Sequence, residues 1–276
     1  MSNISNLGKL KLNEHHSVEL RDMLLLRYEP IAFKLIENEN DVPACAIHPI
    51  KDLGKHMCLC QAYAMTRRDR KTIYMDKTSE WCWCPLVSFG LVECSEGSKQ
   101  FEMISSRLGI KDQSEANKFF SNFPKLEFGK YRGIVTAPLN VCDFEPDIVL
   151  IYCNNAQLRS LLFAVKSLTG KIVNTQMDAI DSCVYSTIPT LKTREFRVTL
   201  PDLGEYERAM ADEDEIILTV PSEQMDGLVT SLRTFDERNM GYRLLSKDMH
   251  LDFPRPPFYN ELFDMWGLEQ GEDWSK

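Results

Sequence analysis

The chain has 276 residues, of which 43% are hydrophobic and 26% charged, and its formal net charge is −9. This length suffices for one large domain or two small ones with a substantial core. The acidic balance argues against an electrostatic grip on nucleic acid or an anionic membrane, and no apolar run approaches the roughly 20 residues of a membrane span. Because the first residues lack the basic start and apolar core of a signal peptide, we expect a cytoplasmic protein with no nucleic-acid or membrane partner.

The N-terminal part of the chain predicts mainly helices. Apolar residues at three–four spacing indicate an amphipathic helix over 17–28, and a strand over 31–36 follows it. Two further helices are expected within 98–122, and a strand over 132–139.

The C-terminal part alternates strands and helices. The apolar run 147–152 predicts a strand buried on both faces, and Asn154 or Asn155 can cap the helix that follows over 156–167. The acidic run 212–215 is expected to be a solvated turn. The remaining predicted elements are strands over 171–176, 195–200 and 216–220 and a helix that Ser222 caps. The fold class is therefore α/β (mixed α+β), with a helix-rich half before a half of alternating strands and helices.

A shift in composition predicts a boundary near residue 140. It divides the chain into a helix-rich, cysteine-containing part at 1–140, a strand–helix part at 141–251 and an aromatic, proline-rich tail at 252–276, although a single domain is also open. The tail predicts a docked helix from the spacing of Phe258, Leu262, Met265 and Trp266. Whether this helix docks in cis or on a partner subunit stays open, so a homo-oligomer formed through the tail is one expectation.

Two cysteine pairs of the form C-x-C, Cys58/Cys60 and Cys82/Cys84, are the most informative motif. Random placement of nine cysteines would give roughly 0.3 such pairs. Residues two apart in an extended backbone point to the same face, so the sulfurs of each pair converge. Closely spaced thiolates are suitable ligands for zinc or an iron–sulfur cluster.

Each pair also leads into a helix-forming segment. Gln61–Met65 follows the first pair, and Pro85, a residue suited to the first helical turn, follows the second. Cys60 and Cys84 are therefore predicted at helix N-termini, where the macrodipole and free N–H groups favour a thiolate. The extended and helical interpretations agree if each pair lies in the extended turn that leads into its helix.

Several short motifs together resemble a known family. They are Cys84 with Gly90-Leu91 six residues on, Pro146-Asp147-Ile148-Val149 with Asn155-Ala156-Gln157, and Leu200-Pro201-x-x-Gly204 before a strand that ends in Val220-Pro221. Over about residues 30–235 the pattern is similar to the uncharacterised ArCR-type family of bacteria and archaea, which is common in anaerobes. The resemblance implies a mixed α/β domain and supplies no established reaction.

The resemblance also divides the cysteines into those that match the family and those that are additions. It implies that Cys60 and Cys84 match recurrent cysteines of the family and that Cys45, Cys58 and Cys82 are additions. Many members have a cysteine and an arginine where this chain has Asp202 and Tyr206, so a role that depends on those two residues is in doubt here.

The first functional hypothesis is a metal- or iron–sulfur-binding protein of anaerobic or redox-linked metabolism. Its ligands to zinc or a cluster would be Cys58, Cys60, Cys82 and Cys84, with Cys45 or His56 as alternates. Two alternatives stay open, because free cysteine is also among the most buried residue types. One is a small-molecule-binding enzyme that uses Cys60 and Cys84 as thiols without a metal, and the other is a scaffold with inert cysteines. Burial is the expectation for Cys94, Cys142, Cys153 and Cys183.

The second hypothesis is a small-molecule pocket at the strand ends beside the cysteines. Asn154, Asn155 and Gln157 would line this pocket, and Arg67 or Arg68 would hold an anionic group. No motif of a named reaction accompanies these residues, so whether the protein is an enzyme stays open.

Overall fold

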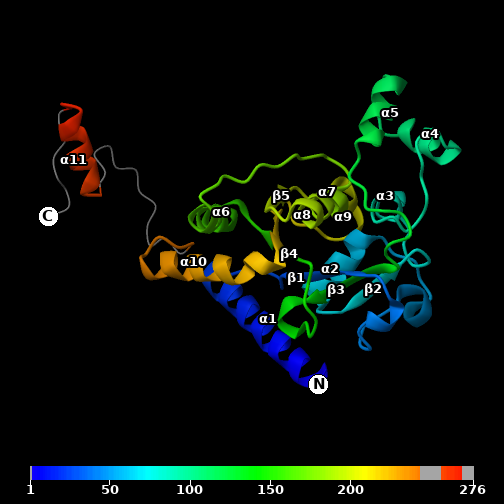
Figure 1. Cartoon of the computed structure of the whole chain (residues 1–276), viewed down its shortest axis with the longest axis horizontal. Coiled ribbons are helices and arrows are strands. Elements are labelled where there is room, and N and C mark those ends of the chain that lie inside the picture. Colours follow the sequence, from blue (N-terminus) through cyan, green and yellow to red (C-terminus); the bar gives the residue numbers. More distant parts are fainter. Residues whose placement is uncertain (1, 243–255, 269–276) are drawn as a thin grey trace. The chain divides into compact units, whose positions relative to one another are not determined.

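The structure, a computed structural model, describes residues 2–242 and 256–268 and confirms the mixed α/β class (Figure 1). The strands are β1 (Ile31–Ile36), β2 (Ile73–Asp76), β3 (Gly133–Pro138), β4 (Ile148–Cys153), β5 (Arg197–Thr199) and β6 (Ile216–Pro221). The helices of the first part are α1 (Ser2–Leu24), α2 (Leu59–Asp69), α3 (Trp83–Ser88), α4 (Lys99–Ser105) and α5 (Gln113–Ser121). Those that follow are α6 (Asn155–Thr169), α7 (Ser182–Tyr185), α8 (Ile188–Thr193), α9 (Leu203–Arg208), α10 (Met225–Glu237) and α11 (Phe258–Met265).

The six strands form one sheet in the order β2–β3–β1–β4–β6–β5, and each neighbouring pair is antiparallel. Ile31 of β1 lies opposite Pro138 on one side and Leu150 on the other, so β1 joins the two halves of the sheet. Strands from both sides of the predicted boundary near residue 140 therefore share one sheet, and residues 2–242 belong to one compact unit. The division into 1–140 and 141–251 stays a prediction.

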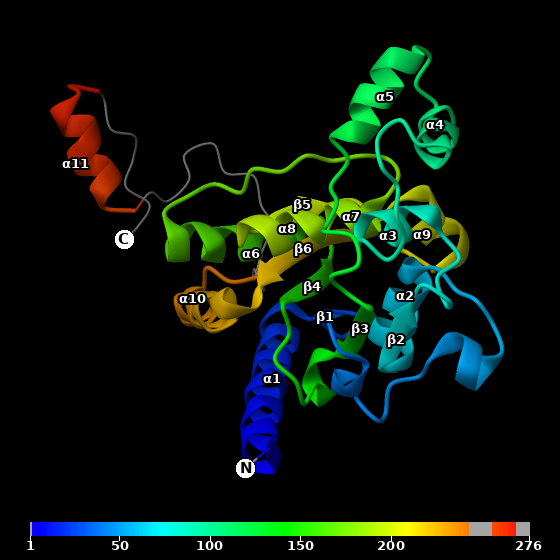
Figure 2. The same ribbon diagram turned by 45° about the vertical axis from the view of Figure 1, so that its right-hand side comes forward.

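Helices cover both faces of this sheet (Figures 1 and 2). Along β4, Val149 and Ile151 pack with residues of α1, α6 and α10, whereas Ile148, Leu150 and Tyr152 pack with residues of α2, α3, α7 and α8. Because successive strand residues point to opposite faces, burial on both faces requires an unbroken apolar run. This confirms the predicted double burial of β4.

Three expectations for local structure are wrong. Helix α1 begins at Ser2 rather than near Ser17, whose buried hydroxyl donates to Glu29 at 2.8 Å instead of capping a helix. The segment 171–176 is not a strand, and Ile172 within it is exposed. Helix α10 begins at Met225, because residues 222–224 form a separate 3₁₀ turn after Pro221.

The acidic run 212–215 forms the predicted turn, in which Glu213 and Asp214 are exposed, but Glu215 at its end is buried. The two terminal guanidinium nitrogens of Arg67 donate to the Glu215 carboxylate, at 2.5 and 3.0 Å, and the Arg67 side chain is 1% exposed. The guanidinium also stacks 4.1 Å from the ring centroid of Tyr152. This buried pair ties α2 to the start of β6.

The second compact unit contains helix α11. Three of the predicted residues, Phe258, Leu262 and Met265, lie in this helix, and the fourth, Trp266, is its C-cap. Phe258, Met265 and Trp266 are exposed. Docking and homo-oligomer formation through this tail stay predictions. Within residues 2–242 and 256–268, no helix combines the length and the apolar character that crossing a bilayer requires, and the cytoplasmic location stays a prediction.

Replacing Arg67 by Ala should destabilise the fold by about 3–5 kcal/mol, because it leaves the Glu215 carboxylate buried without a partner. The matched control is Arg27→Ala, which removes a half-exposed arginine from Asp212 and Asp214 and should cost less than about 1 kcal/mol. Urea unfolding of both variants measures the difference. Equal costs would contradict the structural role of the buried pair.

Candidate thiol pocket

Five cysteines line one pocket with a volume of about 260 Å³. They are Cys58, Cys60, Cys82, Cys84 and Cys183. Four of them are buried, and Cys82 is the partly exposed one. The structure therefore brings the two C-x-C pairs to the same cavity and adds a fifth sulfur from a distant part of the chain.

Each C-x-C pair occupies the same two positions at a helix start. Cys58 and Cys82 are the N-cap residues of α2 and α3, with extended backbone angles of φ −94°, ψ 159° and φ −120°, ψ 136°. Cys60 and Cys84 are the second residues of the two helices. Both interpretations of the motif are thus confirmed, because the chain is extended at the first cysteine and helical at the second.

The two other helices that reach the pocket repeat this placement. Asp181 is the N-cap of α7 with Cys183 as its second residue, and Asp202 is the N-cap of α9 with Gly204 as its second residue. All four of these residues line the pocket. The N-terminal ends of four helices, α2, α3, α7 and α9, therefore line one cavity.

A backbone pairing holds the first two helix starts side by side. Met57 and Glu80 form an isolated parallel bridge, in which Met57 N–H donates to Ser79 at 3.1 Å and Trp81 N–H donates to Met57 at 3.0 Å. This bridge immediately precedes Cys58 and lies two residues before Cys82. It therefore places the two C-x-C pairs side by side. Cys82 consequently packs against the cluster of Cys58 and Cys60.

Within each pair, the two sulfurs differ in acidity. The Sγ atoms of Cys58 and Cys60 are 3.1 Å apart, and those of Cys82 and Cys84 are 3.5 Å apart. The hydrogen bond with Cys60 lowers the pKa of Cys58 to about 7 against the effect of burial, helped by the Gln61 N–H and by the charge of Arg208. The hydrogen bond with Cys84 likewise lowers the pKa of Cys82.

The second sulfur of each pair holds its proton more strongly. The pKa of Cys60 is raised above its ordinary value by the hydrogen bond with Cys58 and by burial. The pKa of Cys84 is raised by its hydrogen bonds with Cys183 and Cys82 and by burial. Each pair thus combines an N-cap thiol that ionises readily with a neighbouring thiol that stays protonated.

Buried carboxyl groups surround the sulfurs. Burial raises the pKa of Glu80 to about 9, although its Oε1 accepts hydrogen bonds from the Trp81 and Cys82 N–H groups at 3.1 and 2.9 Å. Burial raises the pKa of Asp181 to about 6 against the effect of its hydrogen bond with Cys84. The site therefore contains carboxyl groups that hold their protons more strongly than usual, beside the thiols.

A third carboxyl group, that of Glu205, lies behind the pocket. It is 1% exposed and accepts hydrogen bonds from Ser182 Oγ at 2.5 Å and Tyr152 Oη at 2.8 Å. Burial raises its pKa to about 7 although both of these hydrogen bonds lower it. Its network connects the starts of α7 and α9 to β4.

Two arginines, Arg107 and Arg208, also line the pocket. Cys58, Cys60 and Cys82 raise the pKa of Arg208 against the effect of its burial, so this guanidinium is the cation that faces the thiols. A Cβ on Gly204 would lie 2.6 Å from Arg208 Nη2. Glycine at this position, where the other three helices carry cysteine, leaves room for the guanidinium over the start of α9.

Two of the predicted metal ligands lie outside the pocket. Cys45 is exposed, and the exposed His56 contacts Trp81 with ring centroids 4.2 Å apart and ring planes tilted by 38°. In the part of the chain that the structure describes, no three histidine, cysteine or carboxylate side chains are placed to hold one metal ion. The thiol donors suit a soft metal, but their arrangement does not direct three of them at one point.

The predicted small-molecule residues lie elsewhere. Asn154 caps α6 by accepting from Gln157 N–H at 2.9 Å, and the Gln157 side chain reaches the Leu24 carbonyl at 2.9 Å. Asn155 is the exposed first residue of α6. The structural capping role of Asn154 is confirmed, and ligand contact by these three residues stays a prediction.

The predicted anion-holding arginines likewise have partners within the protein. Arg67 pairs with Glu215, and Arg68 donates to the Met210 carbonyl and pairs with Asp212 at 3.3 Å. Neither arginine lines the thiol pocket.

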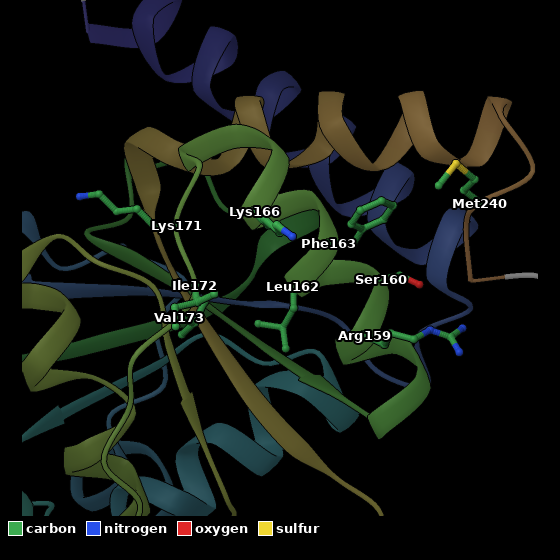
Figure 3. A pocket seen from close by; sticks show the side chains of 9 residues that line it. All are labelled: Arg159, Ser160, Leu162, Phe163, Lys166, Lys171, Ile172, Val173 and Met240. Atoms are coloured by element: carbon green, nitrogen blue, oxygen red, sulfur yellow. The ribbon is translucent and has the colours of Figure 1, made fainter. Parts of the chain in front are cut away.

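Another cavity, of about 490 Å³, lies beside α6 (Figure 3). Helix α6 contributes Arg159, Phe163 and Lys166 to it, and Met240 lies opposite, after the end of α10. The start of α6, where Asn154, Asn155 and Gln157 lie, does not line this cavity.

Sequence reasoning missed Cys183 and the three carboxyl groups. Cys183 stands alone in the sequence, and its burial is confirmed, but its Sγ lies 3.9 Å from that of Cys84. The one local signal is the repeated pattern of a polar N-cap with cysteine two residues later, which Asp181 and Cys183 share with the C-x-C pairs.

An antiparallel sheet covered by helices, with five thiols gathered where helices begin, defines an α/β protein with a buried thiol site. A family model described as uncharacterised ArCR matches residues 19–231, a range that includes every cysteine of the pocket. The chain therefore belongs to this family, which confirms the resemblance seen in its motifs. No curated protein and no solved structure was found to match the chain.

Glu205 should make stability depend on pH. Its folded-state pKa of about 7 lies above the ordinary value of 4.5, so the folded state binds this proton more tightly. Its contribution to the free energy of unfolding is full below pH 4.5 and is lost as pH rises to about 7, by about 3 kcal/mol in total. Glu205→Gln should remove this decline, whereas Glu207→Gln, on the exposed side of α9, should keep it. Unfolding in urea between pH 4.5 and 8 measures both, and parallel profiles for Glu205→Gln and the parent would contradict the assignment.

Proposed function

We propose that the pocket is a dithiol centre that reduces the disulfide bond of a small molecule. The observation that carries this proposal is the placement of each pair at a helix N-cap and second position, with sulfurs 3.1 and 3.5 Å apart. A disulfide bond needs the two Sγ atoms to approach to about 2.05 Å, a further closure of about 1–1.5 Å. The pocket volume of about 260 Å³ suits a small molecule rather than a folded partner.

Cys82 is the attacking residue of the second pair, because it is the most accessible of the five cysteines that line the pocket and its pKa is lowered. Its thiolate attacks one sulfur of the substrate, the substrate S–S bond breaks, and the first thiol leaves with a proton from solvent. The Cys84 thiol then attacks Cys82 Sγ, gives up its proton, and releases the second thiol. The protein loses two hydrogen atoms, and the substrate gains two.

Cys58 and Cys60 have the same roles in the first pair. Gln61 supports Cys58 in two ways, because its backbone N–H lowers the pKa of Cys58 and its Oε1 accepts from Cys58 N–H at 3.0 Å. This capping box fixes the attacking sulfur at the start of α2.

Reaction of the reduced protein with a chromogenic aromatic disulfide tests the proposal. The expected result is release of two aromatic thiols for each pair, with Cys58–Cys60 and Cys82–Cys84 as the first disulfides to form, read by peptide mass spectrometry after early quenching in acid. Cys60→Ser and Cys84→Ser should each trap one aromatic group on the neighbouring N-cap cysteine, because no second thiol displaces it. Cys142→Ser, a buried cysteine outside the pocket, is the matched control and should behave as the parent.

The proposal is wrong if aromatic groups stay attached to Cys58 and Cys82 of the parent while Cys60 and Cys84 remain free thiols. It is also wrong if the folded protein does not react at these residues.

The second candidate is a zinc or iron–sulfur centre, and the gathering of five soft donors in one cavity favours it. Cys58, Cys60, Cys82 and Cys84 would hold the metal, after side-chain movement that directs at least three of them to one site. Such a group would supply a structural cross-link or an electron-transfer centre.

Purification without oxygen, followed by metal analysis and a visible spectrum, tests this candidate. A bound metal should protect the four cysteines from alkylation until a chelator removes it, and Cys58→Ser/Cys82→Ser should lose the metal. Stoichiometric alkylation of metal-free protein at Cys58 and Cys82 would contradict it.

A further inference from the structure

Cys183 lies next to a sulfur of the dithiol centre. Its Sγ is 3.9 Å from Cys84 Sγ, and Cys84 Sγ is in turn 3.5 Å from Cys82 Sγ. Cys84 thus has two sulfur neighbours, that of the partly exposed Cys82 and that of the buried Cys183. Cys183 belongs to α7 and Cys84 to α3, two helices that pack against each other although the residues are 99 positions apart.

We propose that Cys183 is a second resolving cysteine, which takes the newly formed disulfide from Cys82 and moves it into the interior. This inference rests on the proposed dithiol chemistry of the pocket. In the step, Cys183 Sγ attacks Cys84 Sγ of the Cys82–Cys84 disulfide. The Cys84–Cys183 bond forms, the Cys82–Cys84 bond breaks, and the proton from Cys183 passes to Cys82. The exchange is intramolecular and needs no further oxidant or reductant.

The transfer has two physical consequences. It restores a free thiol at Cys82, the accessible sulfur, while the oxidised pair lies at Cys84 and Cys183, which are 3% and 5% exposed. It also converts a bond within the start of α3 into a covalent link between α3 and α7. A disulfide across 99 positions restricts the unfolded chain far more than one across two.

The same geometry distinguishes Cys183 from the other buried cysteines. Cys153 is equally buried, but its Sγ–H points to the Ile216 carbonyl at 3.5 Å and it does not line the pocket. Cys153→Ser is therefore a matched control for loss of a buried thiol.

Disulfide mapping tests the relay in a Cys45→Ser/Cys94→Ser background, which removes two accessible cysteines outside the pocket. The reduced protein receives one equivalent of a small aromatic disulfide, is quenched in acid, alkylated and mapped by mass spectrometry. The expected result is that the Cys84–Cys183 linkage becomes dominant as Cys82 returns to the alkylated, free form. A rise in Tm should accompany this transfer.

Cys183→Ser and Cys183→Ala should both lose this linkage and accumulate Cys82–Cys84, with two aromatic thiols still released for that pair. Cys153→Ser should form the Cys84–Cys183 linkage as its background does. Two variants at position 183 separate loss of the sulfur from any effect of a buried hydroxyl on folding.

The possible outcomes separate the two proposals. If the Cys82–Cys84 disulfide forms and persists while Cys183 is alkylated, the relay is wrong and the dithiol function stands. If neither linkage forms and the aromatic group stays on Cys82, both are wrong.

Discussion

Two backbone hydrogen bonds hold the chain before Cys58 beside the chain before Cys82, and the thiol pocket is built on this pairing. They belong to the isolated bridge of Met57 with Glu80. Since α2 and α3 begin directly after this bridge, their first turns open on the same cavity and their cysteines meet. The bridge is therefore the constraint that turns two local motifs into one site.

Burial is the second constraint, because it limits how many groups in the pocket can be charged. In the buried Arg67–Glu215 pair, each charge is neutralised by the opposite charge of its partner. The acids nearest the sulfurs have no such full compensation, and burial raises the pKa values of Glu80 to about 9 and Asp181 to about 6. The interior thus tolerates ion pairs and protonated acids in preference to isolated anions.

Local features of the site could be predicted from the sequence, and features that depend on packing could not. The cysteines at helix starts follow from the residues beside them, such as Pro85, and so does the cap of α6 by Asn154. The proximity of Cys183 to Cys84 depends on how α7 packs against α3 after 99 intervening positions. The burial of Glu215 depends likewise on Arg67, so a run of four acids looked solvated although one of them lies in the core.

The same limit on charge explains why each sulfur pair is asymmetric. Ionising one thiol of a pair makes a second anion 3.1 or 3.5 Å away unfavourable, so one proton remains and is shared as a hydrogen bond. The N-cap sulfur becomes the anion because it receives that hydrogen bond, and in Cys58 also the Gln61 N–H and the field of Arg208. The second sulfur keeps its proton until the first is bonded to another sulfur. In the proposed dithiol chemistry, this asymmetry gives the attacking role to the N-cap thiol and the resolving role to the thiol two residues later.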